Sequence, residues 1–112
     1  MKPSTLALAA LLVLPAAALA GDRATPEKPG GSCQVAAFVC ADYDASIAPT
    51  AKDVCVKYKF SWSAKPCATK GVVGTCVKPE GAGKSYSHTY PPGSVESARK
   101  ACTNTPGGVF VP

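Results

Sequence analysis

Six cysteines limit what this chain can fold into more strongly than any other feature of its 112 residues. An even number of cysteines in a small exported protein predicts a disulfide framework. Zinc binding is the competing use of cysteine, but the gaps between successive cysteines hold 6, 14, 11, 8 and 25 residues, so no C-x2-C pair occurs. We therefore expect three disulfides and no metal site. The cysteines are Cys33, Cys40, Cys55, Cys67, Cys76 and Cys102.

The N-terminal residues, MKPSTLALAALLVLPAAALA, have the pattern of a cleavable secretory signal peptide. Lys2 provides a basic start, residues 6–14 form an apolar run, and residues 18–20 (Ala-Leu-Ala) form a small-x-small cleavage motif. A membrane-spanning helix needs about 20 apolar residues, whereas Pro15 interrupts this run. We expect a signal peptide over 1–20, cleavage after Ala20, no transmembrane anchor after cleavage, and a secreted or periplasmic product.

The charge of the chain is moderately positive, with 12 basic and 7 acidic residues and a formal net charge of +5. Loss of Lys2 with the signal peptide leaves 11 basic residues against 7 acidic ones, or +4. The basic residues are scattered singly, whereas nucleic-acid footprints are clustered. We expect a solvated basic surface, no nucleic-acid partner, and a monomer that binds an unidentified protein or glycan outside the cytoplasm.

Composition divides the exported part into a short leader and one domain. Residues 21–31, GDRATPEKPGG, contain Pro, Gly and charge but no large apolar side chain, which is typical of a flexible leader. Residues 32–112 are then a single disulfide-rich domain. Ser32 could cap a short helix over CQVAAFVCA, and in such a helix Cys33 and Cys40 could not bond to each other, because they would lie about 10.5 Å apart along the axis.

The clearest periodicity lies at residues 54–63, VCVKYKFSWS, where apolar and polar residues alternate. This alternation predicts a half-buried strand with its aromatic side toward the core. The same interpretation leaves Cys55 on the outer side of the strand. A Thr50-x-x-Asp53 capping box immediately upstream favours a short helix instead, so both interpretations remain open, with the strand preferred.

The second half predicts two strands, a helix and a last strand. GVVGTCVK (71–78) and KSYSHTY (84–90) read as strands joined by a hairpin turn at Gly81 and Gly83, and a last strand follows NTPGG. SVESARKAC (94–102) reads as a helix with Ser94 as its N-cap. Val95, Ala98 and Cys102 fall on one side of it, which should face the sheet.

These elements predict a small disulfide-stapled α+β domain. It has a short antiparallel sheet, one C-terminal helix packed on the sheet and an optional short N-terminal helix. Cys102 should form a bridge from the helix to the sheet, with Cys76 the first choice and Cys67 the second.

Two segments resemble ligand-binding loops. Gly83-Lys84-Ser85 matches the last three residues of the phosphate-binding loop motif G-x-x-x-x-G-K-[ST]. Lys78 occupies the position of the first glycine that this motif requires, so a hairpin turn is expected. Residues 42–53 place oxygen donors at positions 1, 3, 5 and 12 of a calcium loop, although Ile47 replaces the glycine of position 6. The expectation is a polar turn, with calcium as the weaker alternative. The four donors are Asp42, Asp44, Ser46 and Asp53.

No constellation for catalysis stands out. His88 is the only histidine, no serine lies in a nucleophile-elbow motif, and a cysteine nucleophile would have to be an unpaired thiol. We expect no enzymatic activity, no catalytic residues and no cofactor. Alternation places Tyr86, His88 and Tyr90 on one face of the second strand, where they are the candidate partner contacts.

Residues 67–112 resemble the C-terminal part of small exported bacterial proteins, many of them lipoproteins, for which no activity is established. The shared features are a V-G-x-C strand, a Tyr-rich segment, an Ala-rich helix ending in Cys and a final G-G-x-F. The resemblance implies export and disulfides. This chain has Gly21 after the expected cleavage point, where a lipoprotein has its cysteine.

Together these features predict a non-enzymatic binding or structural protein of the envelope or extracellular space. The first alternative is a secreted effector, either a protease inhibitor acting through residues 64–69 around Cys67 or a cationic antimicrobial protein. The second alternative is a small hydrolase that uses His88.

Overall fold

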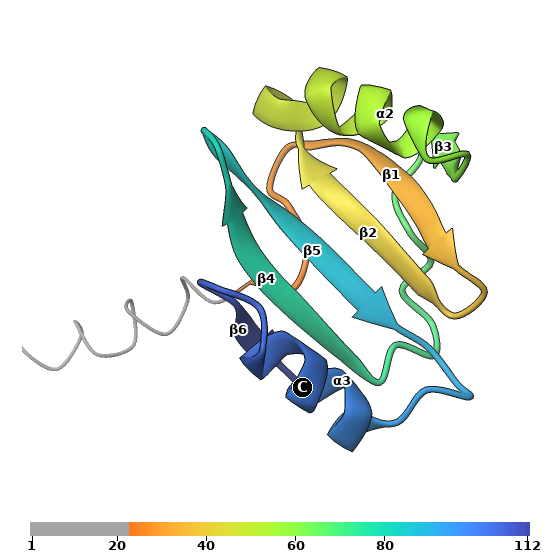
Figure 1. Ribbon diagram of the computed structural model, residues 1–112, viewed down its shortest axis with the longest axis vertical. Helices are drawn as coiled ribbons and strands as arrows, with labels where there is room; N and C mark the ends of the chain where they lie inside the picture. The colour runs from red at the N-terminus through yellow and green to blue at the C-terminus, as the bar shows by residue number, and fades with distance from the viewer. Residues whose placement is uncertain (1–22) are drawn as a thin grey trace, which may run out of the picture.

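A six-stranded antiparallel sheet organises the part of the chain that the computed structural model describes, residues 23–112 (Figure 1). The strand order is β3-β1-β2-β5-β4-β6, and two helices complete an α+β domain. The predicted fold class is confirmed. The expected signal peptide and its cleavage point lie outside the described residues. The elements are β1 (Pro29–Ala36), β2 (Val39–Asp44), the 3-10 helix η2 (Ala45–Ile47), α2 (Ala48–Lys57), β3 (Ser61–Ser63), β4 (Gly74–Glu80), β5 (Gly83–Thr89), α3 (Val95–Thr103) and β6 (Val109–Val111).

The first half of the domain differs from prediction, because the segment expected to be an N-terminal helix is the β1–β2 hairpin. Cross-strand pairs share a face of a sheet, and the hairpin pairs Cys33 with Ala41 and Gln34 with Cys40. The two cysteines therefore point to opposite faces. Strand β1 also begins at Pro29, inside the expected leader 21–31, so the folded domain starts before Ser32.

Residues 54–63 are also not one strand, because helix α2 continues to Lys57 and only 61–63 form the short strand β3. The helix buries Cys55, which removes the difficulty that the strand interpretation created. Helix α2 ends in a Schellman motif: the Phe60 N–H donates to the Cys55 carbonyl at 2.9 Å, and the Lys59 N–H donates to the Val56 carbonyl at 2.9 Å. Lys59 has φ 63° at the position where glycine is usual.

The second half follows the sequence closely. Strands β4 and β5 pair from Gly74–Thr89 to Glu80–Gly83, and Gly81 opens their two-residue turn with φ 60°, as a type II′ turn prefers. Ser94 caps α3 by accepting the Ser97 N–H at 3.0 Å, as predicted. One detail is wrong: Val95 does not face the sheet but is 43 % exposed.

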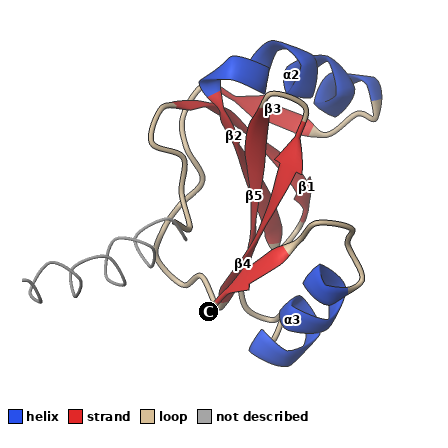
Figure 2. Cartoon of the chain, turned by 90° about the vertical axis from the view of Figure 1, so that its left-hand side faces the viewer, coloured by secondary structure: helices blue, strands red, loops and turns tan. Residues whose placement is uncertain are grey.

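Both helices lie on one face of the sheet, called here the helical face (Figure 2). Disulfides attach each helix to a strand: Cys33–Cys55 joins β1 to α2, and Cys76–Cys102 joins β4 to α3, the pairing preferred from the sequence. The opposite face, called the loop face, carries residues 23–28 and the connection 64–73. The third disulfide, Cys40–Cys67, fixes that connection to β2.

The buried core consists mainly of half-cystines and small residues. Its buried hydrophobic members are Cys33, Cys40, Ala41, Ala48, Cys55, Cys67, Tyr86, Ala98 and Cys102. Larger apolar side chains such as Val56 and Tyr58 are 56 % and 61 % exposed. A domain that buries so little aliphatic surface depends on its crosslinks, so the three disulfides are a principal source of its stability.

Candidate functional site

A buried polar network connects the three central strands on the loop face. The His88 Nε2 atom lies 2.9 Å from Asp42 Oδ2, and the His88 Nδ1 atom lies 2.8 Å from Thr75 Oγ1. The second oxygen of Asp42 accepts the backbone N–H of Cys67 at 2.9 Å. Antiparallel register brings Asp42, Thr75 and His88 together. His88 on β5 lies opposite Thr75 on β4 and opposite Cys40 on β2, and Asp42 lies two residues after Cys40 on the same face.

This network resembles a hydroxyl–histidine–carboxylate triad, but it is closed to substrate. Thr75, His88 and Asp42 are 2 %, 3 % and 1 % exposed. With Asp42 as a carboxylate, the His88 Nε2–H donates to it and Nδ1 accepts from the Thr75 hydroxyl. Both oxygens of Asp42, both ring nitrogens of His88 and the hydroxyl of Thr75 have hydrogen-bond partners. The network therefore joins β2, β5 and β4 beneath the connection 64–73.

The same cluster does not make a metal site. Asp42, Cys67 and His88 place potential ligand atoms within 4.8 Å of one another. However, the sulfur of Cys67 is bonded to Cys40 and is not a thiolate. Two ligands remain, and both are committed to the hydrogen bonds described above.

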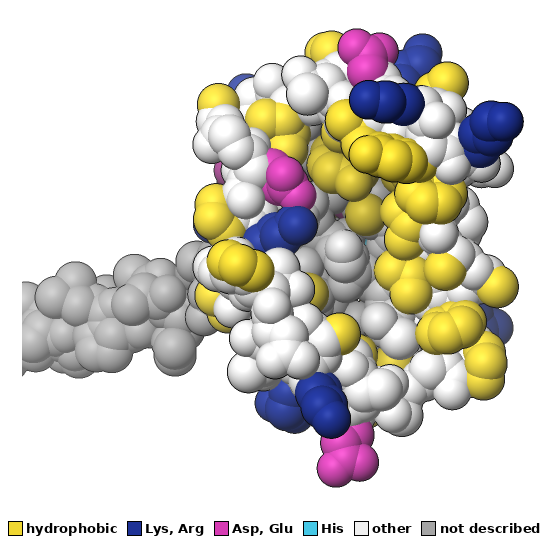
Figure 3. Space-filling model, in the orientation of Figure 1, with side chains coloured by type: hydrophobic (Ala, Val, Ile, Leu, Met, Phe, Trp, Pro, Cys, Tyr) yellow, Lys and Arg dark blue, Asp and Glu magenta, His cyan; other side chains and the backbone are white. Residues whose placement is uncertain are grey.

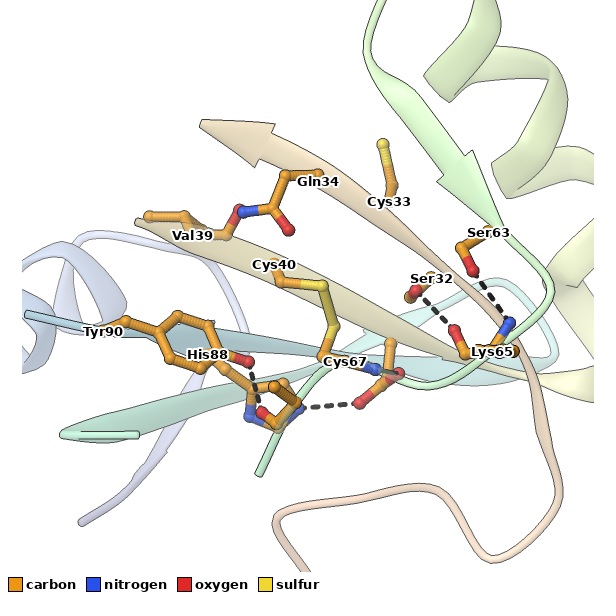
Figure 4. Close-up of a disulfide and its surroundings, with 12 residues drawn as sticks. Ser32, Cys33, Gln34, Val39, Cys40, Ser63, Lys65, Cys67, His88 and Tyr90 are labelled. Atoms are coloured by element: carbon orange, nitrogen blue, oxygen red, sulfur yellow. Dashed lines mark hydrogen bonds and ion pairs between the residues drawn. A yellow bond between two sulfur atoms is a disulfide. The ribbon is translucent and has the colours of Figure 1, made fainter. Parts of the chain in front are cut away.

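The connection 64–73 is held against the sheet by its backbone (Figure 4). Ser32 Oγ donates to the Lys65 carbonyl at 2.7 Å, and Tyr90 Oη donates to the Ala68 carbonyl at 2.6 Å. With the Cys40–Cys67 bond between them, these contacts cover Asp42 and His88. Burial, followed by the charge of Asp42, raises the pKa of Tyr90, so the hydroxyl remains a donor near neutral pH.

The predicted contact residues do not form one exposed surface. Tyr86 and His88 are only 5 % and 3 % exposed, and the hydroxyl of Tyr90 is used to anchor the 64–73 connection. Alternation correctly placed the three residues on one face of the sheet. The connection 64–73 covers that face at His88 and Tyr90. Of the three, only Tyr86 lines an open cavity.

The residues of the calcium alternative are not arranged as a calcium loop. Asp42 and Asp44 lie on strand β2, whereas Asp53 lies on helix α2, so residues 42–53 do not form a loop around an ion. Asp44 Oδ2 accepts the Lys84 N–H at 2.7 Å, and its Oδ1 accepts the Tyr86 hydroxyl at 3.3 Å. Both carboxylate oxygens of Asp44 therefore already accept hydrogen bonds from the protein.

An open cavity of about 450 Å3 lies on the loop face, between residues 23–28 and strands β4, β5 and β6. The Ala45 N–H donates to the Lys28 carbonyl at 2.8 Å, which fixes the end of the 23–28 segment. Pro26 in this segment is buried, so part of the expected leader is packed against the domain. The lining is Arg23, Glu27, Lys28, Asp44, Ala45, Ser46, Val77, Lys78, Pro79, Lys84, Tyr86, Gly107, Val109 and Val111.

Tyr86 is the polar group at the floor of this cavity. Burial raises its pKa, and the charge of Asp44 and the hydrogen bond to it act in the same direction, while Arg23 opposes them. The phenol therefore remains protonated near neutral pH and keeps donating to Asp44. Tyr86 and Asp44 give the cavity a fixed polar point within an otherwise apolar floor.

The helical face carries a second, smaller depression between α2 and α3 (Figure 3). Its best-defined part is a hollow of about 220 Å3 against α3, lined by Ser87, Thr89, Ala98 and Thr105 among others. This volume is below the roughly 300 Å3 at which ligand pockets usually begin. The larger cavity on the loop face is therefore the stronger candidate site.

The chain has no match among protein-family models, curated proteins or solved structures. Function must therefore be argued from the geometry of the site itself. Within residues 23–112, neither helix combines the length and apolar character needed to cross a membrane.

Sequence reasoning missed the cavity because its lining comes from separate segments. Val77 and Val109 are neighbours only because β6 pairs with β4, and Arg23 belongs to a segment expected to be flexible. The one usable signal was the alternation in TCVKPE and VFVP, which places Val77, Val109 and Val111 on the same face as Tyr86 once the strands are paired.

Proposed function

We propose that this chain is a small, non-enzymatic binding protein that acts outside the cytoplasm, in the cell envelope or extracellular space. The observation that carries the proposal is the open cavity of about 450 Å3, held against a sheet that three disulfides brace. Ligand pockets have volumes of roughly 300–1,000 Å3 and combine an apolar lining with a few polar groups. The cavity has a volume in this range, and it combines an apolar floor at Val77, Val109 and Val111 with a larger share of polar and charged side chains than most ligand pockets have.

The placement of reactive groups supports binding over catalysis. His88 is enclosed with Asp42 and Thr75, and each cysteine is in a disulfide. The two carboxylates of the cavity already have partners, since Asp44 accepts two hydrogen bonds and Glu27 pairs with Arg23 at 3.7 Å. A general base must reach the proton that it removes, and among the described residues of the cavity no group is placed for that role.

Two features support a location outside the cytoplasm. Small disulfide-dense domains are typical of oxidising compartments, and this domain relies on three disulfides where others rely on an aliphatic core. The N-terminal pattern of residues 1–20 is that of a cleavable export signal. The resemblance of residues 67–112 to exported bacterial proteins is consistent with both.

The secreted-effector alternative has weaker support. A protease inhibitor presents its loop backbone to the enzyme, whereas here Lys65 and Ala68 use their carbonyls for hydrogen bonds within the domain. The antimicrobial alternative predicts leakage of vesicles made of anionic lipids at low salt, and we expect none. Leakage at micromolar protein concentration would favour that alternative over a binding protein.

The proposal is tested with the purified, oxidised protein in two assays. The first offers ester, peptide and glycoside substrates, and we expect no turnover. The second follows 1H–15N NMR shifts during titration with soluble oligopeptides, glycan fragments and amphiphilic acids, and at least one class should shift signals around Val77, Lys84 and Val109. Turnover that disappears in a folded His88→Ala variant, or shifts confined to other surfaces, would contradict the proposal.

A further inference from the structure

We propose that the cavity on the loop face binds an amphiphilic anion, a small molecule with one alkyl chain and a carboxylate or phosphate head group. This inference rests on the proposed binding function and specifies its ligand class. It follows from two properties of the lining that lie side by side: an apolar floor formed by three strands, and a basic rim in which two cations have no ion-pair partner within residues 23–112.

The floor is apolar because of strand register. Tyr86 on β5 lies opposite Val77 on β4, which in turn lies opposite Val109 on β6, so their side chains form one row across three strands. Val111 lies two residues further along β6 on the same face and also lines the cavity. Val109 is 50 % exposed. An alkyl chain along this row would remove its methyl groups from water, which is favourable in proportion to the buried area.

The rim carries more positive than negative charge. Its cations are Arg23, Lys28, Lys78 and Lys84, against the acids Glu27 and Asp44.

Ion pairs account for two of these cations. Arg23 pairs with Glu27 at 3.7 Å, and Lys78 pairs with Glu80 at 3.2 Å. Lys28 and Lys84 have no ion-pair partner within residues 23–112. Because hydrogen bonds to charged groups are stronger than neutral ones, an anionic head group beside Lys28 and Lys84 is the occupant that the rim favours.

Asp44 does not cancel this preference. Its carboxylate accepts the Lys84 N–H at 2.7 Å and the Tyr86 hydroxyl at 3.3 Å, so its charge is already stabilised by donors of the protein. The Lys84 ammonium group is at the other end of that residue's side chain and is not used by either contact.

The size of the cavity favours a small molecule over a membrane surface. About 450 Å3 lies in the lower half of the usual range for ligand pockets. Its lining comes from residues 23–28 and from the sheet, so a bound alkyl chain would contact both. A bilayer surface is instead typically bound by an amphipathic helix that buries its apolar face in the interface.

The experiment is calorimetric titration of the purified, oxidised protein with octanoate below its micellar concentration. Octan-1-ol provides an uncharged ligand of equal chain length. We expect octanoate to bind with one site per protein and at least about tenfold more tightly than octan-1-ol. Its affinity should fall as the salt concentration is raised. Octyl phosphate should bind at least as well as octanoate.

Two variants test the rim and the floor separately. Lys28→Gln with Lys84→Gln should weaken octanoate binding at least about tenfold and leave octan-1-ol binding unchanged. The matched control is Lys52→Gln with Lys100→Gln, which removes the same charge from helices α2 and α3 and should have no effect beyond about twofold.

Val109→Thr should weaken both ligands by about three- to tenfold, because it replaces a methyl group by a hydroxyl at constant shape. Its control is Val54→Thr on α2, where the side chain is 48 % exposed and does not line the cavity.

Several outcomes would overturn the inference. They are equal affinities for octanoate and octan-1-ol, equal losses in the rim variant and its control, and binding only to vesicles of phosphatidylglycerol. If octanoate fails but another ligand class shifts the cavity signals, the ligand class is wrong and the binding function stands. If no ligand class perturbs the cavity, both proposals fail.

Discussion

Replacing Asp42 should separate a structural role of the buried network from a catalytic one. The Asp42→Ala variant leaves two donors without an acceptor, the Cys67 N–H and His88 Nε2, which the native carboxylate binds at 2.9 Å each. An unsatisfied buried polar group costs about 1–3 kcal/mol, so the free energy of unfolding should fall by roughly 2–6 kcal/mol. A domain of this size has a total of about 5–13 kcal/mol. The Ala variant therefore removes a large part of the stability.

Asp42→Asn should cost much less. The amide oxygen can accept the Cys67 N–H, and its NH2 group can donate to His88 Nε2 if the imidazole proton moves to Nδ1 and donates to Thr75. Thr75 Oγ1 lies 2.8 Å from Nδ1 and can accept that proton. The charge assistance is lost, and the Thr75 hydroxyl no longer has Nδ1 as its acceptor, so we expect a loss of about 1–2 kcal/mol. The tautomer change itself can be observed by 15N NMR of His88.

The assay is urea unfolding of the oxidised protein, followed by the fluorescence of the single tryptophan, Trp62. Asp53→Ala is the control, because Asp53 is an exposed acid on α2 and should change stability by no more than about 0.5 kcal/mol. If the Ala and Asn variants lost equal stability, or if Asp42→Ala matched the control, the hydrogen-bonding argument would be refuted.

Three further predictions concern the crosslinks, the tyrosines and the end of α2. Replacing Cys40 and Cys67 by Ala opens a loop with a sequence separation of 27, and loop entropy predicts a loss of about 3.5 kcal/mol in urea unfolding; a loss below about 1 kcal/mol would contradict it. Tyr86 should titrate above 10.0 by phenolate absorbance. Because its folded-state pKa is raised, its contribution to stability should be complete below pH 10 and decline as pH rises through the folded-state value, and a normal titration would contradict this. Lys59→Gly should raise the free energy of unfolding by up to about 1 kcal/mol, since Lys59 has φ 63°; a loss of stability would show that the lysine side chain makes a contact of greater value.

Elements with strong local signals could be predicted from the sequence. Ser94 marks the start of α3 by a side-chain cap, and Gly81 provides the left-handed conformation at the β4–β5 turn. The Cys76–Cys102 bridge followed from placing Cys102 on the inner side of that helix. The cap and the turn are determined by interactions within a few residues along the chain, and the bridge followed because the local pattern of the helix showed which side Cys102 occupies.

The first half could not be predicted in this way because long-range pairing overrides local preference there. The Ala-rich segment containing Cys33 and Cys40 favours a helix locally, but as a hairpin it directs the two cysteines to opposite faces, where Cys55 and Cys67 meet them. Alternation in residues 54–63 suggested a buried aromatic face, yet Tyr58 is 61 % exposed.

The candidate site was less predictable than the fold. His88 was expected among exposed contacts, but its position opposite Thr75 and its bond to Asp42 depend on the β2–β5–β4 register. The cavity depends on the same long-range order and on packing of residues 23–28, whose composition alone indicates a flexible segment.

The functional surface that we propose is the cavity on the loop face, between residues 23–28 and strands β4 to β6. Isotope-filtered NMR of octanoate bound to valine-methyl-labelled protein measures this directly. We predict intermolecular nuclear Overhauser effects from the alkyl chain to Val77, Val109 and Val111, and none to the exposed Val54 and Val95. Effects confined to Val54 and Val95, or to Val39 in the depression on the helical face, would contradict the claim.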